Sequence, residues 1–171
     1  MIRTPEWPPE LLSRSAHIAD TARRSMTLAQ LNVFAGFVYT VLMDSFINDG
    51  NQHSPTFDQR VTWGVLTMYH VCTHFIAPLT EDVFSPQSQC HSSCSFVELV
   101  AENPQDPLWF VSHFWGDPFA LLVRMLNYHA LAHKLGDHAT YWVCTFGSLP
   151  LHWGFAELTL LLCSKQPARS G

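Results

Sequence analysis

Charged side chains are scarce in this sequence, where Asp, Glu, Lys and Arg together make up 13% of the 171 residues. Basic residues are the scarcer kind: nine Lys and Arg stand against fourteen Asp and Glu, which gives a formal net charge of −5. A protein that binds nucleic acid through its phosphates needs a basic face, so this composition argues against a nucleic-acid partner. The only adjacent basic pair is Arg23-Arg24, which is typical of a solvated helix face.

Glycine-rich phosphate-binding loops are also absent. Neither G-x-G-x-x-G nor G-x-x-x-x-G-K-[S/T] occurs, which argues against kinases, P-loop NTPases and Rossmann-type dinucleotide-binding domains. The stretch Leu28–Ile47 has membrane-spanning length but contains Asp44 and two amide side chains, which an isolated span tolerates poorly. The N-terminal residues include Pro and Glu in place of the basic and apolar regions of a secretory signal. We therefore expect no membrane span, a cytoplasmic location and reduced thiols at the five cysteines.

Apolar residues, by contrast, are plentiful. They make up 47% of the chain and include twelve Phe and six Trp, which is enough to bury a core. We expect an α-rich α/β protein in three parts. Residues 1–78 form a helical N-terminal segment, residues 79–94 a linker rich in Ser, Gln and Pro, and residues 95–171 a partial α/β unit with a divergent C-terminal helix.

Capping signals predict where several helices begin. Thr27 and Gln30 have the spacing of a capping box, which predicts a helix from about residue 28. Ser95 and Glu98 have the same spacing and predict a short helix after the linker. Two further helices are expected, one from about residue 10 to residue 24 and one from residue 56 to residue 77.

A strand, a helix and a second strand are predicted between residues 108 and 146. The run from Leu108 to Pro118 is typical of a buried strand that turns into a helix, with Asp117 as N-cap and Pro118 as first helical residue. A helix with apolar three- and four-residue spacing follows up to Gly136, and residues 140–146 form the second strand. Because two strands joined by a helix are expected to be parallel, the segment is a partial βαβ unit.

An open α/β sheet binds its ligands at the carboxyl ends of its strands. His113 is the leading candidate there, because it precedes a helix N-terminus whose amides and dipole could hold an anion. Cys144 and His113 could form a thiolate–imidazole pair, with Asp117 orienting the imidazole. The alternative is structural, with the His113 and Trp115 rings packed in the fold, Asp117 as a cap and Cys144 as an inert thiol. The candidate ligand-binding residues are Ser112, His113, Trp115 and Asp117, and the candidate catalytic residues are His113, Asp117 and Cys144.

Two groups of residues are candidate metal ligands. His129 and His133 are four residues apart on one helix, a spacing that can place two imidazoles on one ion. Cys90, His91 and Cys94, with one histidine from elsewhere, could form a zinc site, although they lack the Cys-x-x-Cys spacing. The alternative is that these histidines lie on amphipathic helices and these cysteines in a loop. We expect no bound cofactor, with NAD and zinc as the two alternatives.

Two strings carry a family resemblance. Ser-His-Phe-Trp-Gly at residues 112–116 and Tyr-Trp-Val-Cys-Thr-Phe at residues 141–146 resemble the signature of a largely uncharacterised family from unicellular eukaryotes. The first string also resembles the first strand of TIR-like domains. That resemblance implies a parallel, flavodoxin-like sheet and a role in signalling assembly or, in some branches, in cleavage of nicotinamide dinucleotides. After residue 146 the family pattern gives way to Gly-Ser-Leu-Pro, and about 25 residues remain, which implies a truncated member.

These observations lead to one hypothesis and two alternatives. The leading hypothesis is a non-enzymatic, TIR-like module that acts by binding a protein partner or by self-association. The first alternative is a nucleotide-binding or NAD-cleaving enzyme that uses His113, Trp115, Asp117 and Cys144. The second alternative is a truncated paralogue with no activity of its own.

Overall fold

The computed structural model of the chain describes residues 17–44, 47–48, 58–81, 83–85 and 90–149. None of the helices in these ranges has both the length and the apolar character needed to cross a membrane. The helices are α1 (Leu28–Asp44), α2 (Met68–Val71), a π-helical turn (Cys72–Ile76), α3 (Ala77–Thr80), α4 (Phe96–Val100), α5 (Phe119–Ala132) and α6 (Cys144–Gly147). The strands are β1 (Met26–Thr27), β2 (Val83–Ser85), β3 (Cys90–Ser92), β4 (Trp109–Val111) and β5 (Thr140–Val143).

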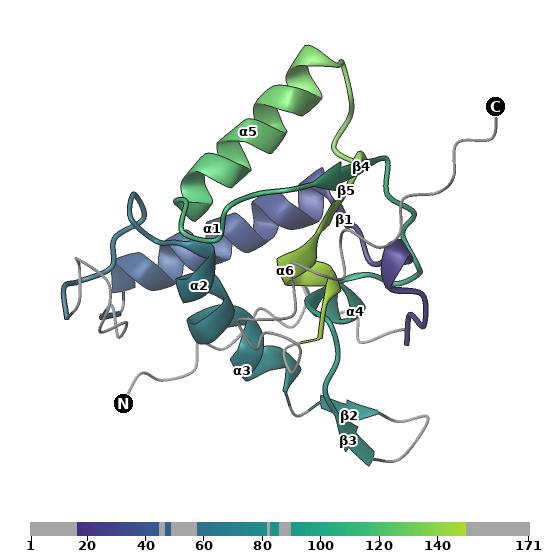
Figure 1. The fold of residues 1–171 in the computed structure, drawn as a ribbon, viewed down its shortest axis with the longest axis horizontal. Coiled ribbons are helices and arrows are strands. Elements are labelled where there is room, and N and C mark those ends of the chain that lie inside the picture. The colour runs from purple at the N-terminus through teal and green to yellow at the C-terminus, as the bar shows by residue number, and fades with distance from the viewer. Residues whose placement is uncertain (1–16, 45–46, 49–57, 82, 86–89, 150–171) are drawn as a thin grey trace.

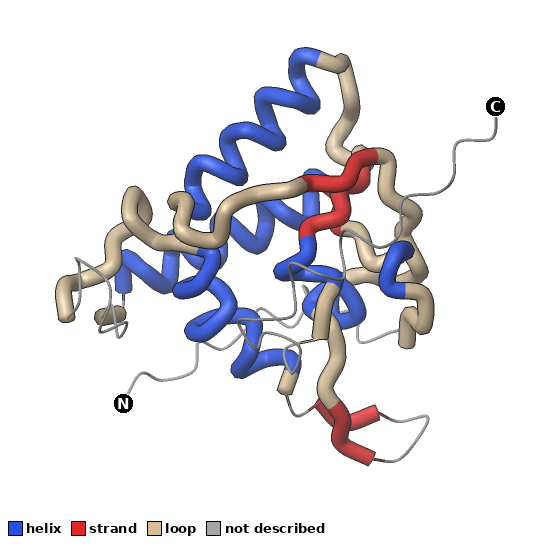
Figure 2. Tube along the Cα trace, in the orientation of Figure 1, coloured by secondary structure: helices blue, strands red, loops and turns tan. Residues whose placement is uncertain are grey.

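A small mixed sheet lies between α5 and α6 and beside the start of α1 (Figures 1 and 2), in the strand order β1-β5-β4. β4 and β5 are parallel, with Trp109 opposite Tyr141, and α5 connects them. The predicted βαβ unit is therefore confirmed, and the protein is an α-rich α/β fold. β1 pairs antiparallel with β5, so the N-terminal segment contributes a strand to the same sheet.

The predicted capping box before α1 is present. The Thr27 hydroxyl accepts the Gln30 N–H at 3.1 Å, and the Gln30 side chain accepts the Thr27 N–H at 2.8 Å. The Gln30 amide also donates to the Val100 carbonyl at 3.0 Å, which ties this cap to the end of α4. α1 packs against α5 as well, where Asn32 and Asn127 exchange two amide hydrogen bonds of 3.0 and 2.8 Å.

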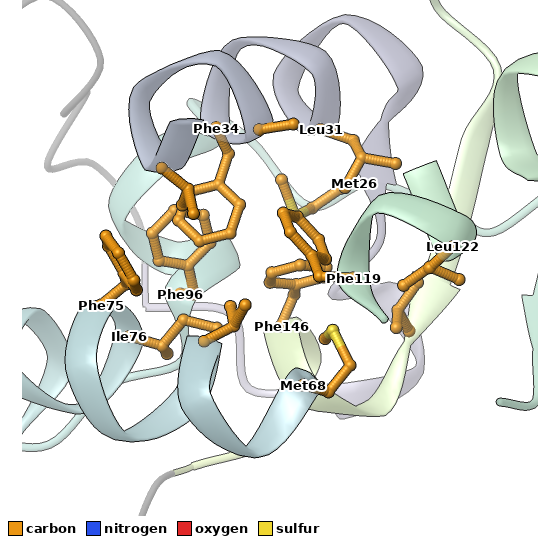
Figure 3. Packing of buried hydrophobic residues seen from close by; sticks show 14 of the residues in the cluster. Met26, Leu31, Phe34, Met68, Phe75, Ile76, Phe96, Phe119, Leu122 and Phe146 are labelled. Atoms are coloured by element: carbon orange, nitrogen blue, oxygen red, sulfur yellow. The ribbon is translucent and has the colours of Figure 1, made fainter. Parts of the chain in front are cut away.

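Phenylalanine rings from four helices meet in one core (Figure 3). The Phe34 ring of α1 lies 4.8 Å from the Phe96 ring of α4, 5.5 Å from Phe146 of α6 and 5.8 Å from Phe119 of α5, measured between ring centroids. These tilted and edge-on arrangements are the ones that aromatic pairs prefer. The helical segment and the α/β unit therefore share a core as well as a sheet.

The helix expected to end at residue 24 is not seen in the described residues from 17 onward. The chain there forms only a short 3-10 turn, Thr21–Arg23. Arg24, expected on a solvated helix face, is 4% exposed. Its guanidinium donates two hydrogen bonds to the Ile18 carbonyl, at 2.8 and 2.6 Å, and lies 3.5 Å from the Glu98 carboxylate. These partners explain how the charge is buried, because a buried guanidinium needs both acceptors and a counter-charge.

The helix expected over residues 56–77 begins later and ends later. It starts at Met68, where Thr67 supplies the N-cap and His70 accepts the Thr67 N–H at 3.0 Å. It then passes through the π-helical turn and continues beyond Pro78 to Thr80. Pro78 follows the π-helical turn directly, and its missing N–H removes one backbone hydrogen bond from the continuing helix.

Part of the stretch expected as a linker, residues 79–94, has regular structure. β2 and β3 form an antiparallel pair with Phe84 opposite His91. The β2–β3 pair projects from the body of the fold and lies below the three-stranded sheet in the view of Figure 1. The predicted divergent C-terminal helix lies outside the described residues.

Both strands of the βαβ unit are shorter than the sequence predicts. β5 ends at Val143, and Cys144 already begins α6. β4 was expected to be buried, yet Trp109 is 42% and Phe110 68% exposed. β4 is one of the two edge strands of the three-stranded sheet and pairs only with β5.

Candidate functional site

The loop from β4 to α5 carries four of the predicted site residues. A second segment holds this loop in place: Thr67 pairs with Pro118 in an antiparallel bridge, and the Met68 N–H donates to the Trp115 carbonyl at 3.1 Å. Ser112 and Asp117 are exposed, whereas Trp115 is half-buried. The start of α2 therefore positions the carboxyl end of β4, which sequence spacing does not reveal.

The N-terminus of α5 differs from the prediction. Pro118, not Asp117, occupies the N-cap position, and no side chain caps the helix there. The Phe119 N–H donates to the Leu66 carbonyl at 2.6 Å. This amide is consequently unavailable to an anion, which weakens the expected anion site at the helix N-terminus.

His113 lies in a confined position beside Trp115. The two rings are nearly parallel, at 8°, with centroids 6.4 Å apart. Both imidazole nitrogens are buried and have no hydrogen-bond partner among the described residues. Burial lowers the pKa of His113 below its usual value, and the nearby Asp117 carboxylate offsets part of that effect. The imidazole is therefore favoured in its neutral form.

Cys144 is buried at the start of α6, away from the environment expected for a nucleophile. The Cys144 thiol interacts electrostatically with the buried thiol of Cys72, in the π-helical turn. Burial raises the pKa of Cys72 well above its usual value, and Cys144 raises it further. Within the described part of the chain, no hydrogen bond, ring contact or electrostatic interaction joins His113 to Cys144. The structure thus brings His113, Trp115 and Asp117 together and leaves Cys144 apart from them.

The cysteine group of the predicted zinc site is only partly described. Cys90 and His91 belong to β3, and their side chains lie outside the described part of the structure. Cys94 is half-buried, and burial together with the Glu98 charge raises the pKa of its thiol to about 12. No three His, Cys, Asp or Glu side chains in the described ranges are arranged to hold a metal ion.

His129 and His133 do come together on α5, with two aromatic partners that the sequence analysis missed. The two imidazole centroids are 4.4 Å apart. The Trp109 ring of β4 lies 4.7 Å from His129 and 5.7 Å from His133. The Tyr141 hydroxyl of β5 is 3.1 Å from Nδ1 of His129. The parallel pairing of Trp109 with Tyr141 is what brings these two strand residues to the same helix end.

A second feature that the sequence analysis missed is an apolar row on the solvent side of α5. Met125 is 58%, Tyr128 73% and Leu121 42% exposed, and Ala132 extends the row and is also exposed. We call these four residues the outer face of α5. In Figure 1 the C-terminal half of α5 stands away from α1. The available signal was that apolar residues occur on the solvent side of α5 as well as on its buried side, which is unusual for a helix that is buried on one side only.

Comparisons with protein-family models, with curated proteins and with solved structures found no match to this chain.

Proposed function

We propose that this protein is a cytoplasmic, non-enzymatic assembly module, distantly TIR-like in its βαβ unit, which associates with a second copy of itself. The interface is the outer face of α5. The observation that carries the proposal is the row of exposed apolar side chains on a helix whose opposite side is already buried. Contiguous exposed apolar surface on a folded domain is characteristic of an interaction site.

The spacing of the outer face suits helix pairing. Leu121, Met125, Tyr128 and Ala132 follow one another at steps of four, three and four residues, as in the heptad repeat of paired helices. In an antiparallel pair with a two-fold axis between Met125 and Tyr128, each Met125 meets Tyr128 of the second copy. Leu121 then meets Ala132, so a large side chain faces a small one. Methionine against an aromatic ring is a favourable contact, and a two-fold axis makes the interface self-complementary.

The charge pattern is compatible with this pairing. Arg124 is the only charged residue of α5, and it lies beside the outer face. Two identical faces that are rich in charges of the same sign would repel each other, whereas two copies of the outer face of α5 would not. The self-association is therefore expected to depend on apolar burial and to change little with salt.

The experiment is light scattering behind size-exclusion chromatography over a range of concentrations, with wild type, Met125→Glu and Met43→Glu. Met43 is the matched control because it is 63% exposed but lies on α1. Since burying one Met is worth about 1.5 kcal/mol and a dimer contains two, Met125→Glu should weaken association roughly 100-fold or more. Met43→Glu should associate like wild type.

Two results would contradict the proposal. One is a wild-type monomer up to about 1 mM, where association stronger than about 4 kcal/mol would be visible. The other is that Met43→Glu and Met125→Glu weaken self-association equally. The interface would then lie elsewhere, or the added negative charge itself would cause the weakening. If both variants keep the circular dichroism spectrum of wild type, they are folded, and a loss of association is then not caused by unfolding.

A second candidate function is nucleotide binding at the carboxyl end of β4. The observation that favours it is the pair of buried, unpartnered nitrogens of His113 beside the Trp115 ring. A ligand held there, such as NAD, should raise the melting temperature of wild type and not of His113→Ala, because only the folded protein binds it. If neither NAD nor related nucleotides shift the melting temperature, this function is ruled out. If self-association is absent too, the alternative of an inactive, truncated paralogue is favoured.

A further inference from the structure

We propose that the cluster formed by His129, His133, Trp109 and Tyr141 binds one transition-metal ion of the copper(II) class. His129 and His133 supply the two protein ligands through their Nε2 atoms, and water completes the coordination. The site is distinct from the strand-end residues and from the outer face of α5, so it does not depend on the proposed function.

The geometry of the two imidazoles suits a shared ion. They lie four residues apart near the C-terminus of α5, and their ring centroids are 4.4 Å apart. With metal–nitrogen distances of about 2.0 Å, two imidazoles at a right angle around one ion have centroids roughly 4.5 Å apart. His133 is the C-cap residue directly after α5, and its N–H donates to the His129 carbonyl at 3.0 Å, which holds His133 next to the last turn of the helix. The negative end of the helix dipole also favours a cation there.

Tyr141 prepares His129 for coordination. Its hydroxyl lies 3.1 Å from Nδ1 of His129, and Tyr141 is 2% exposed, so the contact is fixed by the fold. When Nδ1 carries the proton and donates it to the phenol oxygen, the lone pair of Nε2 is free for a metal. A hydrogen bond from the second ring nitrogen is the usual support for a histidine ligand.

A second histidine pair of the same spacing shows why the cluster is special. His70 and His74 are also four residues apart, but their ring centroids are 6.4 Å apart. Nδ1 of His70 accepts the Thr67 N–H at 3.0 Å, so in the neutral ring the proton is on Nε2. That tautomer removes Nε2 as a ligand. The sequence spacing is the same in both pairs, whereas the hydrogen bonding favours metal binding only at His129 and His133.

Copper(II) is the expected ion because the protein supplies two neutral imidazoles and no charged ligand. Affinity for such a nitrogen site rises along the series from Mn²⁺ to Cu²⁺, and Cu²⁺ tolerates two right-angle nitrogen ligands with water in the other positions. Mg²⁺ and Ca²⁺ prefer oxygen ligands and should not bind. The exposed side of the cluster, where His133 is exposed and Trp109 is 42% exposed, leaves a path for the ion.

Trp109 provides a direct optical signal. Its ring lies 4.7 Å from the His129 ring, and a paramagnetic copper ion so close quenches indole fluorescence. The full chain is titrated with CuSO₄, and fluorescence and electron paramagnetic resonance spectra are recorded in parallel. The variants are His133→Ala, Tyr141→Phe and Trp109→Phe, with His138→Ala as the matched control at an exposed histidine outside the cluster.

We expect His133→Ala to lower copper affinity at least 10-fold and Tyr141→Phe to lower it by a factor of about 10, as support residues of metal ligands do. Trp109→Phe should lose the part of the quenching that comes from Trp109 but keep the nitrogen-coordinated resonance spectrum. His138→Ala should match wild type, and its titration also measures copper held by the remaining histidines. The proposal is overturned if His133→Ala and His138→Ala bind copper equally, or if the spectrum of wild type shows no nitrogen coordination. Circular dichroism of each variant separates lost coordination from lost folding.

Discussion

Glu98 is buried at the point where the N-terminal segment meets α4, and its replacement by Gln should be strongly destabilising. One carboxylate oxygen accepts the Ile18 N–H at 2.8 Å and lies 3.5 Å from the Arg24 guanidinium. The other accepts the Ser95 N–H at 2.8 Å and the Ser95 hydroxyl at 2.9 Å. Both oxygens therefore face donors, and neither position suits an NH₂ group.

The size of the effect follows from these contacts. Glu98→Gln keeps the volume but turns one oxygen into a donor, so at least one buried N–H loses its acceptor, at a cost of about 1–3 kcal/mol. Arg24 also loses its counter-charge while 4% exposed, and breaking a buried pair in this way costs roughly 3–5 kcal/mol. Because Arg24 keeps its two bonds to the Ile18 carbonyl, we expect both costs at the lower end of their ranges and a total of about 4 kcal/mol. That is a large part of the typical stability of a domain, about 5–15 kcal/mol.

The assay is urea unfolding followed by circular dichroism, with Glu102→Gln as the control. Glu102 is exposed and follows α4 by two residues, so its replacement should change stability by less than about 0.5 kcal/mol. Arg24→Met combined with Glu98→Gln should be less destabilising than the sum of the two single changes, because the pair is coupled. A loss below about 1 kcal/mol for Glu98→Gln, or additive behaviour in the double variant, would refute the reasoning.

Two further predictions concern the replacement of two glycines by alanine and the pH dependence of stability. Gly36 lies within α1 with open space where the Cβ of an alanine would sit, so Gly36→Ala should raise stability by about 1 kcal/mol in urea unfolding. Gly147→Ala should instead lower stability, because its Cβ would lie 2.9 Å from the Arg24 carbonyl oxygen and 3.0 Å from the Trp142 indole nitrogen; equal effects at the two glycines would contradict this. The pKa of His113 is lowered from 6.5 on folding, so the unfolded chain takes up that proton first as the pH falls. Stability should therefore decrease below about pH 6.5, and His113→Phe should show a smaller decrease in melting temperature between about pH 7.5 and 5.5; identical pH profiles would exclude this role for His113.

Features encoded within a few residues were predictable. The capping boxes of Thr27 with Gln30 and of Ser95 with Glu98 both form as the spacing predicts. The parallel βαβ unit also forms, because a helix that packs back along the first strand returns the chain to the start of that strand. In each case the interacting groups are close in sequence or the connection itself restricts the geometry.

Features that depend on distant segments were not predictable. The Ser95–Glu98 spacing indicated a capping box, but not that the same carboxylate would pair with Arg24 and anchor Ile18. The prediction that β4 is buried was wrong, because an apolar run does not reveal which distant segments will cover it. The candidate site shows the same division: the rings of His113 and Trp115, two residues apart in sequence, are nearly parallel, whereas Cys144 interacts electrostatically with Cys72 from the π-helical turn.

The sequence alone therefore determined the starts of α1 and α4, the parallel βαβ unit and the pairing of His129 with His133 on one helix face. The tertiary structure decided which faces of those elements are covered. It placed Trp109 and Tyr141 against the two histidines and left the outer face of α5 exposed. The physical reason is that local hydrogen bonds and helix periodicity involve residues a few positions apart. Burial depends instead on which distant segments pack together, and both proposed binding surfaces are consequences of that packing.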